Sequence, residues 1–597
     1  MNFHPNDVQR RARVASALLF LAFVFLGGSF FRTQILQHAQ YVLQSETNRL
    51  REVPIPAPRG VVYDRRGAII AENIPGYAVS VLAPNADSLR AALHRLSGTI
   101  PLSDEQIETV IRRFRKNVNR PAMIFADASF DLVSVLEEHS VEFPGLIIQA
   151  TPKRYYPDST AVAALAGYTG EVSEAELQSK SYVGYKPGQQ VGKVGFEKEY
   201  ESRLRGKEGV RFVEVDARGR VVREAGARQD LMPDPGPPMY TNIDLDLQKF
   251  VVGIFGDSLQ GAAVALEPKS GEVLALHSAP SYDPNRFIGG VPAEYYNALR
   301  SDPRKPLLNK ATQGKYAPGS TWKLTTAIVA LQDGVATLED RMPVPCTGGF
   351  QYGNRWWKCY KKEGHGSLTL AQAIEQSCDV YFYQLGLKIG LTKLVAGGVS
   401  LGAGERTGID LPSEAKPDYP SSPATDYFNK KYGARGWTQQ AASLNLAIGQ
   451  GENAQTVVSM ARFYSALATD GEAARPQVVR GVSEKVRLFQ LDSAQMAGLH
   501  AALAGVVSRG TAAASRIEGV ALAGKTGTAQ SGKFVGTVEL NHAWFVGFAP
   551  ANDPKIVVAV MLEFGGHGTR AAHIASRIIE HYLKVTLKQS ILTEGDE

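Results

Sequence analysis

Three short polar motifs constrain the fold of this chain most, because their side chains serve one another only if folding brings them together. Ser320-Thr321-Trp322-Lys323 comes first, and Ser377-Cys378-Asp379 begins 57 residues after Ser320. Lys525-Thr526-Gly527-Thr528 begins 148 residues after Ser377. Each motif carries groups that can move a proton or bind an anion. We therefore expect a fold that gathers a helix start, a loop and a strand at one pocket.

The first motif precedes a predicted helix, whose apolar stripe consists of Leu324, Ile328 and Leu331. Lys323 would then lie one helical turn from Ser320 on the same face. A serine hydroxyl becomes a good nucleophile when a neighbouring base removes its proton, and a desolvated lysine can be that base. Free amides at the helix start can also stabilise an oxyanion. Taken alone, a helix-capping serine followed by a solvated lysine is the simpler explanation.

The second and third motifs supply complementary groups. Ser377 is a second hydroxyl that could relay a proton, and Asp379 could fix its loop. The third motif is predicted at the edge of a strand, where Gly527 lets a substrate backbone lie close. Lys525 offers a positive charge for a carboxylate, and the two threonine hydroxyls can hydrogen-bond it. A capped turn and a polar edge strand are the alternative explanations.

An apolar segment near the N-terminus predicts a membrane anchor. Val14 to Phe31 is an 18-residue stretch without a charge, bounded by Arg13 and Arg32. It just meets the length needed to cross a bilayer as a helix. Arg10 and Arg11 also precede it, which predicts a cytoplasmic N-terminus and an extracytoplasmic remainder. A cleaved signal peptide and a buried core helix are the alternatives, but no good small-x-small site follows the segment.

Length and composition indicate a globular protein with at least two cores. The chain has 597 residues, of which 44% are hydrophobic and 21% charged. Lysine and arginine outnumber the acidic residues by only 65 to 59, which gives no case for nucleic-acid binding. The proline-rich segment 233–238 predicts a linker. The expected regions are a cytoplasmic tail (1–13), an anchor (14–34), a non-catalytic domain (35–236), a catalytic domain (237–588) and a tail (589–597).

The region after the linker is predicted to be an α/β domain. Residues 262–266 and 272–276 are apolar runs around a turn, which is typical of a hairpin. Residues 542–548 and 555–564 are strand-like and largely apolar, as expected for a sheet covered on both faces. The middle of the region is rich in helical patterns. The sheet should therefore be built from both ends of the domain.

All three cysteines of the chain fall within 33 residues. They form the pattern Cys346-x12-Cys359-x5-His365-x12-Cys378, and three thiolates with one imidazole suit a structural Zn²⁺ ion. Cys378 lies inside the second motif, and in an extended loop it would point away from its neighbours. A metal there would brace the loop without joining the chemistry. A disulfide with one free thiol, or three unrelated cysteines, are the alternatives. His542 is expected to be a hydrogen-bonded strand residue, not a ligand.

Further motifs make the chain resemble a class B penicillin-binding protein over nearly its whole length. They are Arg59–Gly67 with Ala71–Asn73, Gly192–Glu197 with Tyr200-Glu201 and Leu204–Gly206, and Ala447–Gly451. The three motifs described first fit the same family. Its second motif commonly ends in Asn, and the presence of Asp379 resembles the elongation-specific branch. Some members of that branch carry a metal in the region of the cysteines.

This resemblance implies a fold and a set of roles. The fold is α/β of the α+β type: a serine β-lactamase-like transpeptidase domain with an antiparallel sheet flanked by helices. An elongated mixed pedestal domain and one N-terminal transmembrane helix would complete it. Ser320 would be the acyl-ester nucleophile, Lys323 the general base, Ser377 the proton relay and Lys525 the carboxylate anchor. The backbone N–H groups of Ser320 and Thr528 would form the oxyanion hole.

The resemblance also implies a reaction and partners. The enzyme would cross-link D-Ala-D-Ala stem peptides of peptidoglycan and be acylated by β-lactams, and attack by water would make it a carboxypeptidase. A RodA-like glycan polymerase and MreC-like proteins would be its partners at the inner membrane, with the catalytic domain in the periplasm. Catalysis would need no cofactor. A division-specific transpeptidase, or a β-lactam sensor or scaffold, are the alternatives; a β-lactamase is disfavoured because no deacylating glutamate can be assigned.

Overall fold

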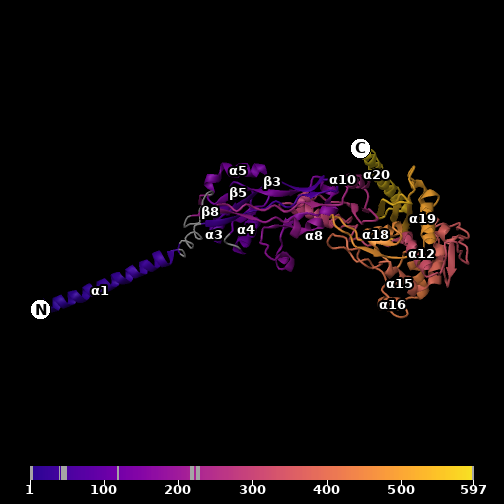
Figure 1. Cartoon of the computed structure of the whole chain (residues 1–597), viewed down its shortest axis with the longest axis horizontal. Coiled ribbons are helices and arrows are strands. Elements are labelled where there is room, and N and C mark those ends of the chain that lie inside the picture. The colour runs from indigo at the N-terminus through magenta and orange to yellow at the C-terminus, as the bar shows by residue number, and fades with distance from the viewer. Residues whose placement is uncertain are drawn as a thin grey trace. The chain divides into compact units, whose positions relative to one another are not determined.

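The computed structural model describes residues 5–38, 41, 50–116, 120–215, 221–223 and 229–594. They form two compact units whose segments alternate along the chain (Figure 1). The first unit comprises Met1–Pro58, Pro75–Lys153 and Gly206–Pro235, and the second comprises Arg59–Ile74, Arg154–Arg205 and Gly236–Glu597. Two segments before the linker thus pack with the predicted catalytic region. The domain boundaries given above stay a prediction.

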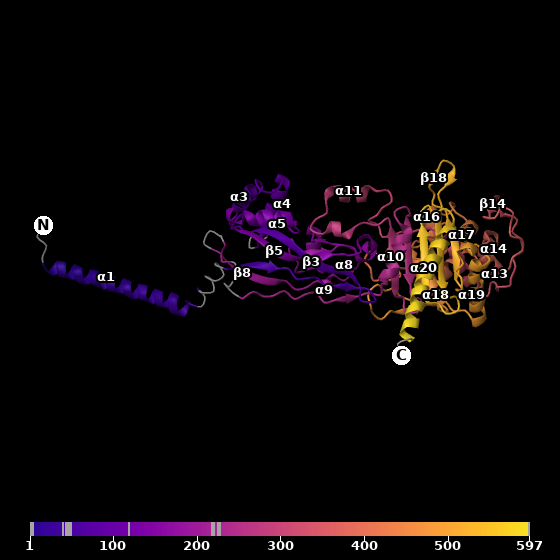
Figure 2. The ribbon, with the colours of Figure 1, turned by 90° about the horizontal axis from the view of Figure 1, so that it is seen from above.

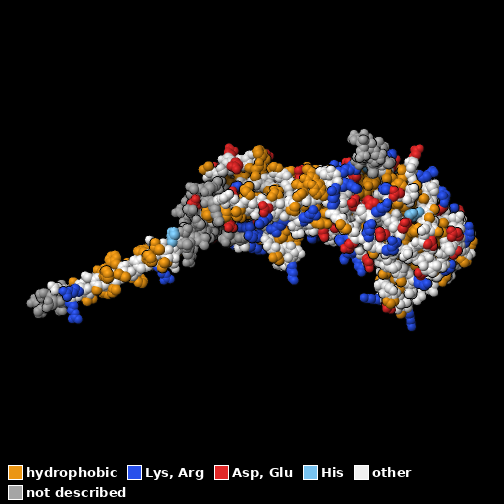
Figure 3. Space-filling model, viewed as in Figure 1, with side chains coloured by type: hydrophobic (Ala, Val, Ile, Leu, Met, Phe, Trp, Pro, Cys, Tyr) orange, Lys and Arg blue, Asp and Glu red, His pale blue; other side chains and the backbone are white. Residues whose placement is uncertain are grey.

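Helix α1 (Pro5–Phe31) contains the predicted anchor and continues as a π-helical turn, η1 (Arg32–Leu36). Its apolar side chains are exposed, with Phe25 at 76% exposure. Figure 3 shows apolar side chains along most of the helix, after the basic residues near its N-terminal end. Within the described part of the chain, it is the one helix long and apolar enough to cross a membrane. Residues 1–4 of the predicted cytoplasmic tail lie outside the described residues.

The first unit combines short helices with strands. Strands β1 (Leu50–Ile55), β8 (Gly209–Val215) and β9 (Val221–Arg223) form an antiparallel sheet. Helices α3 (Ala86–Leu96), α4 (Asp104–Lys116) and α5 (Phe130–Glu138) share a core with β4 (Ala122–Phe125). Helix α4 shows why it packs there: its apolar residues recur at helical spacing and all are buried, at Ile107, Val110, Ile111 and Phe114.

The second unit is built around a five-stranded antiparallel sheet in the order β12-β11-β21-β20-β17. The strands are β11 (Gly261–Leu266), β12 (Val273–Ala279), β17 (Ala523–Ala529), β20 (His542–Ala549) and β21 (Ile556–Leu562). Every residue of β11, β12 and β21 is buried. The predicted hairpin, the two later strands and a sheet built from both ends of the domain are confirmed.

Helices cover this sheet. Helix α20 (Gly568–Glu594) packs on β20 and β21, α18 (Val457–Ala468) on β11 and β21, and α10 (Leu245–Phe255) on β12. Figure 2 shows α20 lying alongside the sheet. The helix continues through residues 589–594, which the sequence predicted to be a tail, because no glycine or proline interrupts it between Gly568 and Glu594. Residues 595–597 lie outside the described residues.

The middle of the unit is helical, as predicted. It contains η6 (Gly319–Trp322), α12 (Lys323–Gln332), α13 (Leu370–Glu375), α14 (Asp379–Ile389), α15 (Leu391–Ser400), α16 (Ala424–Tyr432), α17 (Gln439–Ala447) and α19 (Ser493–Ser508). Helix α12 is buried on all sides from Lys323 to Leu331, not only along the predicted stripe. It is therefore a central core helix.

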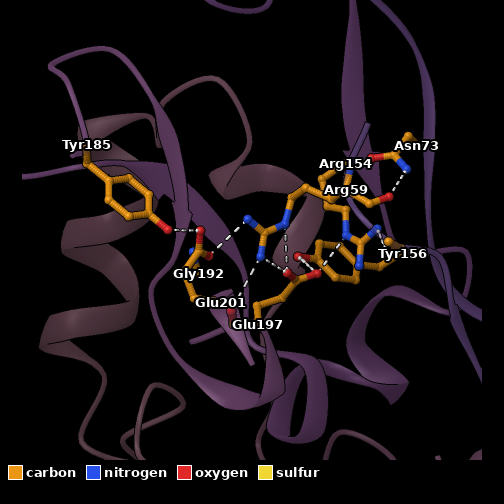
Figure 4. Close-up of polar contacts among 9 residues, drawn as sticks. Arg59, Asn73, Arg154, Tyr156, Tyr185, Gly192, Glu197 and Glu201 are labelled. Carbon is orange, nitrogen blue, oxygen red and sulfur yellow. Dashed lines mark hydrogen bonds and ion pairs between the residues drawn. The ribbon is translucent and has the colours of Figure 1, made fainter. Parts of the chain in front are cut away.

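A buried network of ion pairs connects the Arg59–Gly67 motif with the Gly192–Glu197 motif (Figure 4). Glu197, in helix α8 (Gly195–Glu199), is fully buried and accepts hydrogen bonds from Arg59 Nη2 at 2.7 Å and Arg154 Nε at 2.6 Å. Arg59 Nη1 also pairs with Glu201 at 2.9 Å. Burial alone would raise the pKa of Glu197, but Arg154 and Arg59 outweigh it and lower that pKa. The motifs thus build a charged core.

Candidate active site

The turn that carries Ser320 is fixed from behind by the 447–451 motif. Gly319 has φ +53°, and its N–H donates to the carbonyl oxygen of Gly449 at 3.0 Å. A Cβ on Gly449 would lie 2.2 Å from the Gly319 oxygen, so only glycine permits this approach. Ser320 is partly exposed while Lys323 is fully buried. The predicted helix start is therefore a short 3₁₀ turn that presents Ser320 at the surface of the core.

Lys323 joins the first motif to the second. Its Nζ donates to the Ser377 carbonyl oxygen at 2.8 Å, to Ser377 Oγ at 3.3 Å and to Asp379 Oδ1 at 2.8 Å. The backbone is extended at Cys378 alone: Ser377 adopts φ +53°, and Asp379 already begins α14. A left-handed residue between α13 and α14 turns the chain sharply, so that both side chains can face Lys323.

The third motif lies on β17, at the edge of the sheet as predicted. Strand β17 and the turn that carries Ser320 are in close contact. A Cβ atom added to Gly319 would lie only 2.7 Å from the Thr528 carbonyl oxygen. A Cβ on Gly527 would lie 2.9 Å from the Pro318 oxygen. The absence of a side chain at Gly527 thus serves the packing of strand on turn. The structure brings all three motifs to one place.

Lys525 is fully buried, and its Nζ donates a hydrogen bond to the Thr526 carbonyl oxygen at 3.2 Å. Burial lowers the pKa of Lys525 well below its usual value; the charge of Lys323 lowers it further, and Asp379 partly opposes this. Burial likewise raises the pKa of Asp379, and Lys323 opposes that shift. Two buried lysines therefore interact with one carboxylate, an arrangement typical of functional sites.

Sequence reasoning missed two residues of this site. The backbone N–H of Tyr360 donates to Asp379 Oδ2 at 3.2 Å, and the Thr511 hydroxyl lies 2.6 Å from that of Thr526. Tyr360 directly follows Cys359, so the predicted cysteine cluster could have indicated it. Thr511 follows a glycine in a loop and carries no signal in a single sequence.

The four predicted metal ligands lie together. One ligand atom from each of Cys346, Cys359, His365 and Cys378 lies within 4.8 Å of every other, and the three cysteines are buried free thiols. His365 Nδ1 is 3.5 Å from Cys346 Sγ and 3.6 Å from Cys359 Sγ. A hydrogen bond from Cys378, and a second one from His365, lower the pKa of Cys359 below its usual value.

His542 is not part of the cysteine cluster. Its Nδ1 accepts a hydrogen bond from the Phe564 N–H at 3.3 Å, across neighbouring segments of the sheet. The prediction that it is a hydrogen-bonded strand residue is confirmed.

Both the fold and the site match known families. Residues 261–580 match the penicillin binding protein transpeptidase domain, and residues 54–237 match the penicillin-binding protein dimerisation domain. The chain belongs to the class B penicillin-binding proteins. Within them it is of the type called MrdA or penicillin-binding protein 2, as its relatives show.

Two relatives are named peptidoglycan D,D-transpeptidase MrdA. The one from Acinetobacter baumannii is 30% identical over 620 residues, which cover 99% of this chain and 91% of the relative. The one from Escherichia coli K12 is 30% identical over 604 residues, covering 96% and 94%.

Solved structures agree with this placement. PBP2 in a complex with MreC from Helicobacter pylori has a TM-score of 0.78 at 27% identity, covering 90% of this chain and 99% of that chain. Pseudomonas aeruginosa PBP2 in complex with WCK 5153 has a TM-score of 0.66 at 29% identity, covering 89% and 97%. A chain of a peptidoglycan synthase complex has a TM-score of 0.68 at 30% identity, covering 95% and 97%.

Proposed function

We propose that this chain is a peptidoglycan D,D-transpeptidase of cell elongation, working through an acyl-enzyme on Ser320. The observation that carries the proposal is the position of the buried Lys323 side chain, whose Nζ hydrogen-bonds both Ser377 and Asp379 one helical turn from Ser320 and can act as a base in its neutral amine form. The MrdA relatives support the elongation role.

In the first half-reaction, Ser320 Oγ attacks the amide carbon between the two D-alanines of a stem peptide. Lys323 takes the proton from Oγ as the new ester bond forms. The C–N bond then breaks, and the terminal D-Ala leaves with a proton relayed through Ser377. The N–H groups of Ser320 and Thr528 stabilise the oxyanion, while the Lys525 charge binds the terminal carboxylate.

In the second half-reaction, an amine from a neighbouring stem attacks the ester carbon, and Ser320 recovers its proton. The new amide bond is the cross-link. Attack by water instead releases a shortened stem, which is carboxypeptidase activity and makes the protein a hydrolase. A β-lactam acylates Ser320 because opening its amide ring follows the same first half-reaction.

Labelling with fluorescent penicillin tests the nucleophile. We expect Ser320→Ala to lose covalent labelling while its melting temperature stays within the range of surface substitutions. Ser465→Ala is the matched control, since the Ser465 hydroxyl donates to the Ala461 carbonyl oxygen of its own helix, α18. Undiminished labelling of Ser320→Ala, or equal loss in Ser465→Ala, would contradict the assignment.

We also propose that Cys346, Cys359, His365 and Cys378 hold a structural Zn²⁺ ion. Tetrahedral zinc with bonds of about 2.3 Å to sulfur and 2.05 Å to nitrogen implies a nitrogen–sulfur separation of about 3.6 Å. The two distances from His365 Nδ1, 3.5 and 3.6 Å, fit this value. A closed set of four protein ligands supplies no open position for substrate, so the ion would act only by bracing the loop around Ser377.

Elemental analysis tests this site. Protein purified without chelator should contain about one zinc ion per chain, and Cys359→Ser should reduce that content and lower the melting temperature. His573→Ala, on an exposed face of α20, is a control that should leave zinc unchanged. Metal-free protein that melts at the same temperature as untreated protein would refute the site.

The remaining proposals concern location and partners. The single apolar helix α1 would anchor the chain in the inner membrane, with the basic residues before it in the cytoplasm and the catalytic unit in the periplasm. An MreC-like protein and a RodA-like polymerase would be its partners. The solved PBP2–MreC complex and the peptidoglycan synthase complex support this for related chains. Co-purification from membranes with either partner tests it.

A further inference from the structure

A small hairpin beside the active site has an unusual outer face. It consists of β13 (Gly349–Tyr352) and β14 (Arg355–Lys358), paired in antiparallel register with Gln351 opposite Trp356. Side chains alternate between the two faces of such a hairpin. Phe350 and Trp357 are buried on the inner face, where Trp357 packs edge-on against Tyr383. The outer face therefore carries Gln351, Trp356 and Lys358. Figure 2 shows β14 at the margin of the second unit, near α14.

Trp356 forms a flat platform on this face. A Cβ on Gly349 would lie 2.2 Å from Trp356 Cε2 and 2.4 Å from its Nε1, so the indole rests directly on the bare glycine backbone. The Trp356 side chain is nevertheless 48% exposed. One side of the ring system is thus fixed by the backbone and the other faces solvent. An aromatic ring held in this way is preorganised to stack on a flat ligand, because little freedom is lost on binding.

The hairpin and its flanks are positively charged. Residues 347–366 contain Arg355, Lys358, Lys361 and Lys362 against a single acidic residue, Glu363. Within the described part of the chain, no ion pair is formed by any of these four cations. The ligand complementary to this face therefore combines a flat stacking group with negative charge.

The face leads to the catalytic loop. Two residues after Lys358, the Tyr360 N–H donates to Asp379 Oδ2 at 3.2 Å, and the Tyr360 hydroxyl donates to the Gln376 carbonyl oxygen at 2.8 Å. The Tyr383 hydroxyl donates to the Lys358 carbonyl oxygen at 3.1 Å. Four extended residues span about 13 Å, so Trp356 lies within about that chain distance of Tyr360.

We propose that the outer face of the β13–β14 hairpin binds the glycan part of an uncross-linked peptidoglycan strand. A sugar ring of the strand stacks on Trp356, and a carboxylate of its acidic peptide pairs with Lys358. The ligand is a sugar polymer and not an apolar protein surface, because the platform is one ring flanked by Gln351 and Lys358. This inference rests on the proposed function, which supplies a polymer of this chemistry. The hairpin would hold the strand while one of its stems reaches Ser320.

Direct binding tests the inference. The full-length protein in detergent is first acylated with penicillin, and the titration then follows its affinity for soluble, uncross-linked peptidoglycan strands. We expect Trp356→Ala to weaken binding roughly tenfold, the upper range for a single stacking contact. Trp356→Ala should also bind strands stripped of their peptides more weakly than wild type does. Lys358→Gln, in contrast, should weaken binding of intact strands only. Wild type and Trp356→Ala should have the same affinity for free stem peptide.

Two further variants separate the platform from a general effect on folding. Gly349→Ala keeps the Trp356 side chain, but the added methyl group displaces the indole ring from the backbone of residue 349. This variant should therefore weaken strand binding as Trp356→Ala does. Tyr352 is 36% exposed and lies on the inner face of the hairpin, the face opposite to that of Trp356. Tyr352→Ala should therefore bind strands as wild type does. Equal affinity of wild type and Trp356→Ala, or an equal loss in Tyr352→Ala, would overturn the inference. Failure of the wild type to become acylated would instead refute the proposed function.

Discussion

Replacing Lys525 with methionine should make the protein more stable while removing its function. Lys323 and Lys525 are both fully buried, and Asp379 is the carboxylate that their charges share. The buried site therefore carries an excess positive charge when both amines are protonated. Methionine has a similar length and needs no solvation, so it should fill the space of the Lys525 stem.

The size of the effect follows from the cost of that burial. Replacing buried charged groups by well-packed apolar side chains is neutral or stabilises by about 1–4 kcal/mol. For Lys525→Met we expect stabilisation, because the hydrogen bond that Lys525 Nζ donates is to the neutral carbonyl oxygen of the next residue, at 3.2 Å. Loss of a charge-assisted contact to the substrate carboxylate should at the same time slow acylation by penicillin about 10–100-fold.

The stability gain should depend on pH in a definite direction. The pKa of Lys525 is lowered in the folded protein, so the unfolded chain binds more protons and wild-type stability rises with pH. The free-energy cost of burying the Lys525 charge is fully present below the pKa of Lys525 in the folded protein. It vanishes above the pKa of Lys525 in the unfolded chain, 10.5. The advantage of Lys525→Met should therefore shrink as pH rises toward 10.5, since other groups titrate in both proteins and cancel.

Thermal unfolding of the two proteins in detergent, from pH 7 to 10, measures this difference. Lys310→Met is the matched control: Lys310 is equally buried, but its ammonium is hydrogen-bonded by the carbonyl oxygens of Arg304 at 2.8 Å and Lys305 at 3.3 Å. Its loss removes the side-chain donor to the Arg304 carbonyl oxygen, and should lower the melting temperature. If Lys525→Met melts below wild type at pH 7, or if its advantage grows with pH, the reasoning is refuted.

Two further predictions concern the supports of the site. Glu197→Gln should lower the free energy of unfolding by about 3–5 kcal/mol, because it leaves buried arginines short of a counter-charge, whereas exposed Glu199→Gln should not. Since the pKa of Glu197 is lowered, this difference should diminish as pH falls below 4.5, and a difference that persists there would contradict the account. Gly449→Ala should slow penicillin acylation, because its Cβ would lie 2.2 Å from the Gly319 oxygen and displace the serine turn. Gly253→Ala should be acylated at the wild-type rate, because a Cβ atom at residue 253 meets open space. Equal acylation rates in wild type, Gly449→Ala and Gly253→Ala would contradict this prediction.

Much of the site could be predicted because its groups are short sequence patterns with fixed local geometry. A lysine three residues after a helix-start serine must lie on its face, and a glycine between polar residues on an edge strand permits close approach. The cysteine cluster was equally visible, because four candidate ligands, three cysteines and one histidine, fall within 33 residues. These features depend on local spacing, which a single sequence displays directly.

Features that depend on tertiary contact could not be predicted. Ser377 carries no sign of its left-handed backbone, since that conformation is imposed by the packing of α13 and α14. The Trp356 platform exists because Gly349 pairs with Lys358, two residues from Trp356, and so lies diagonally across the hairpin on the same face. Likewise, the alternation of segments between the two units arises because residues near Arg59 and Glu197 share one ion network.

Peptide mapping by mass spectrometry after penicillin treatment tests the central claim most directly. The account predicts a single adduct, of the mass of one penicillin, on the peptide that contains Ser320 and on the serine hydroxyl itself. An adduct on another residue, or fully active protein that takes up none, would contradict it.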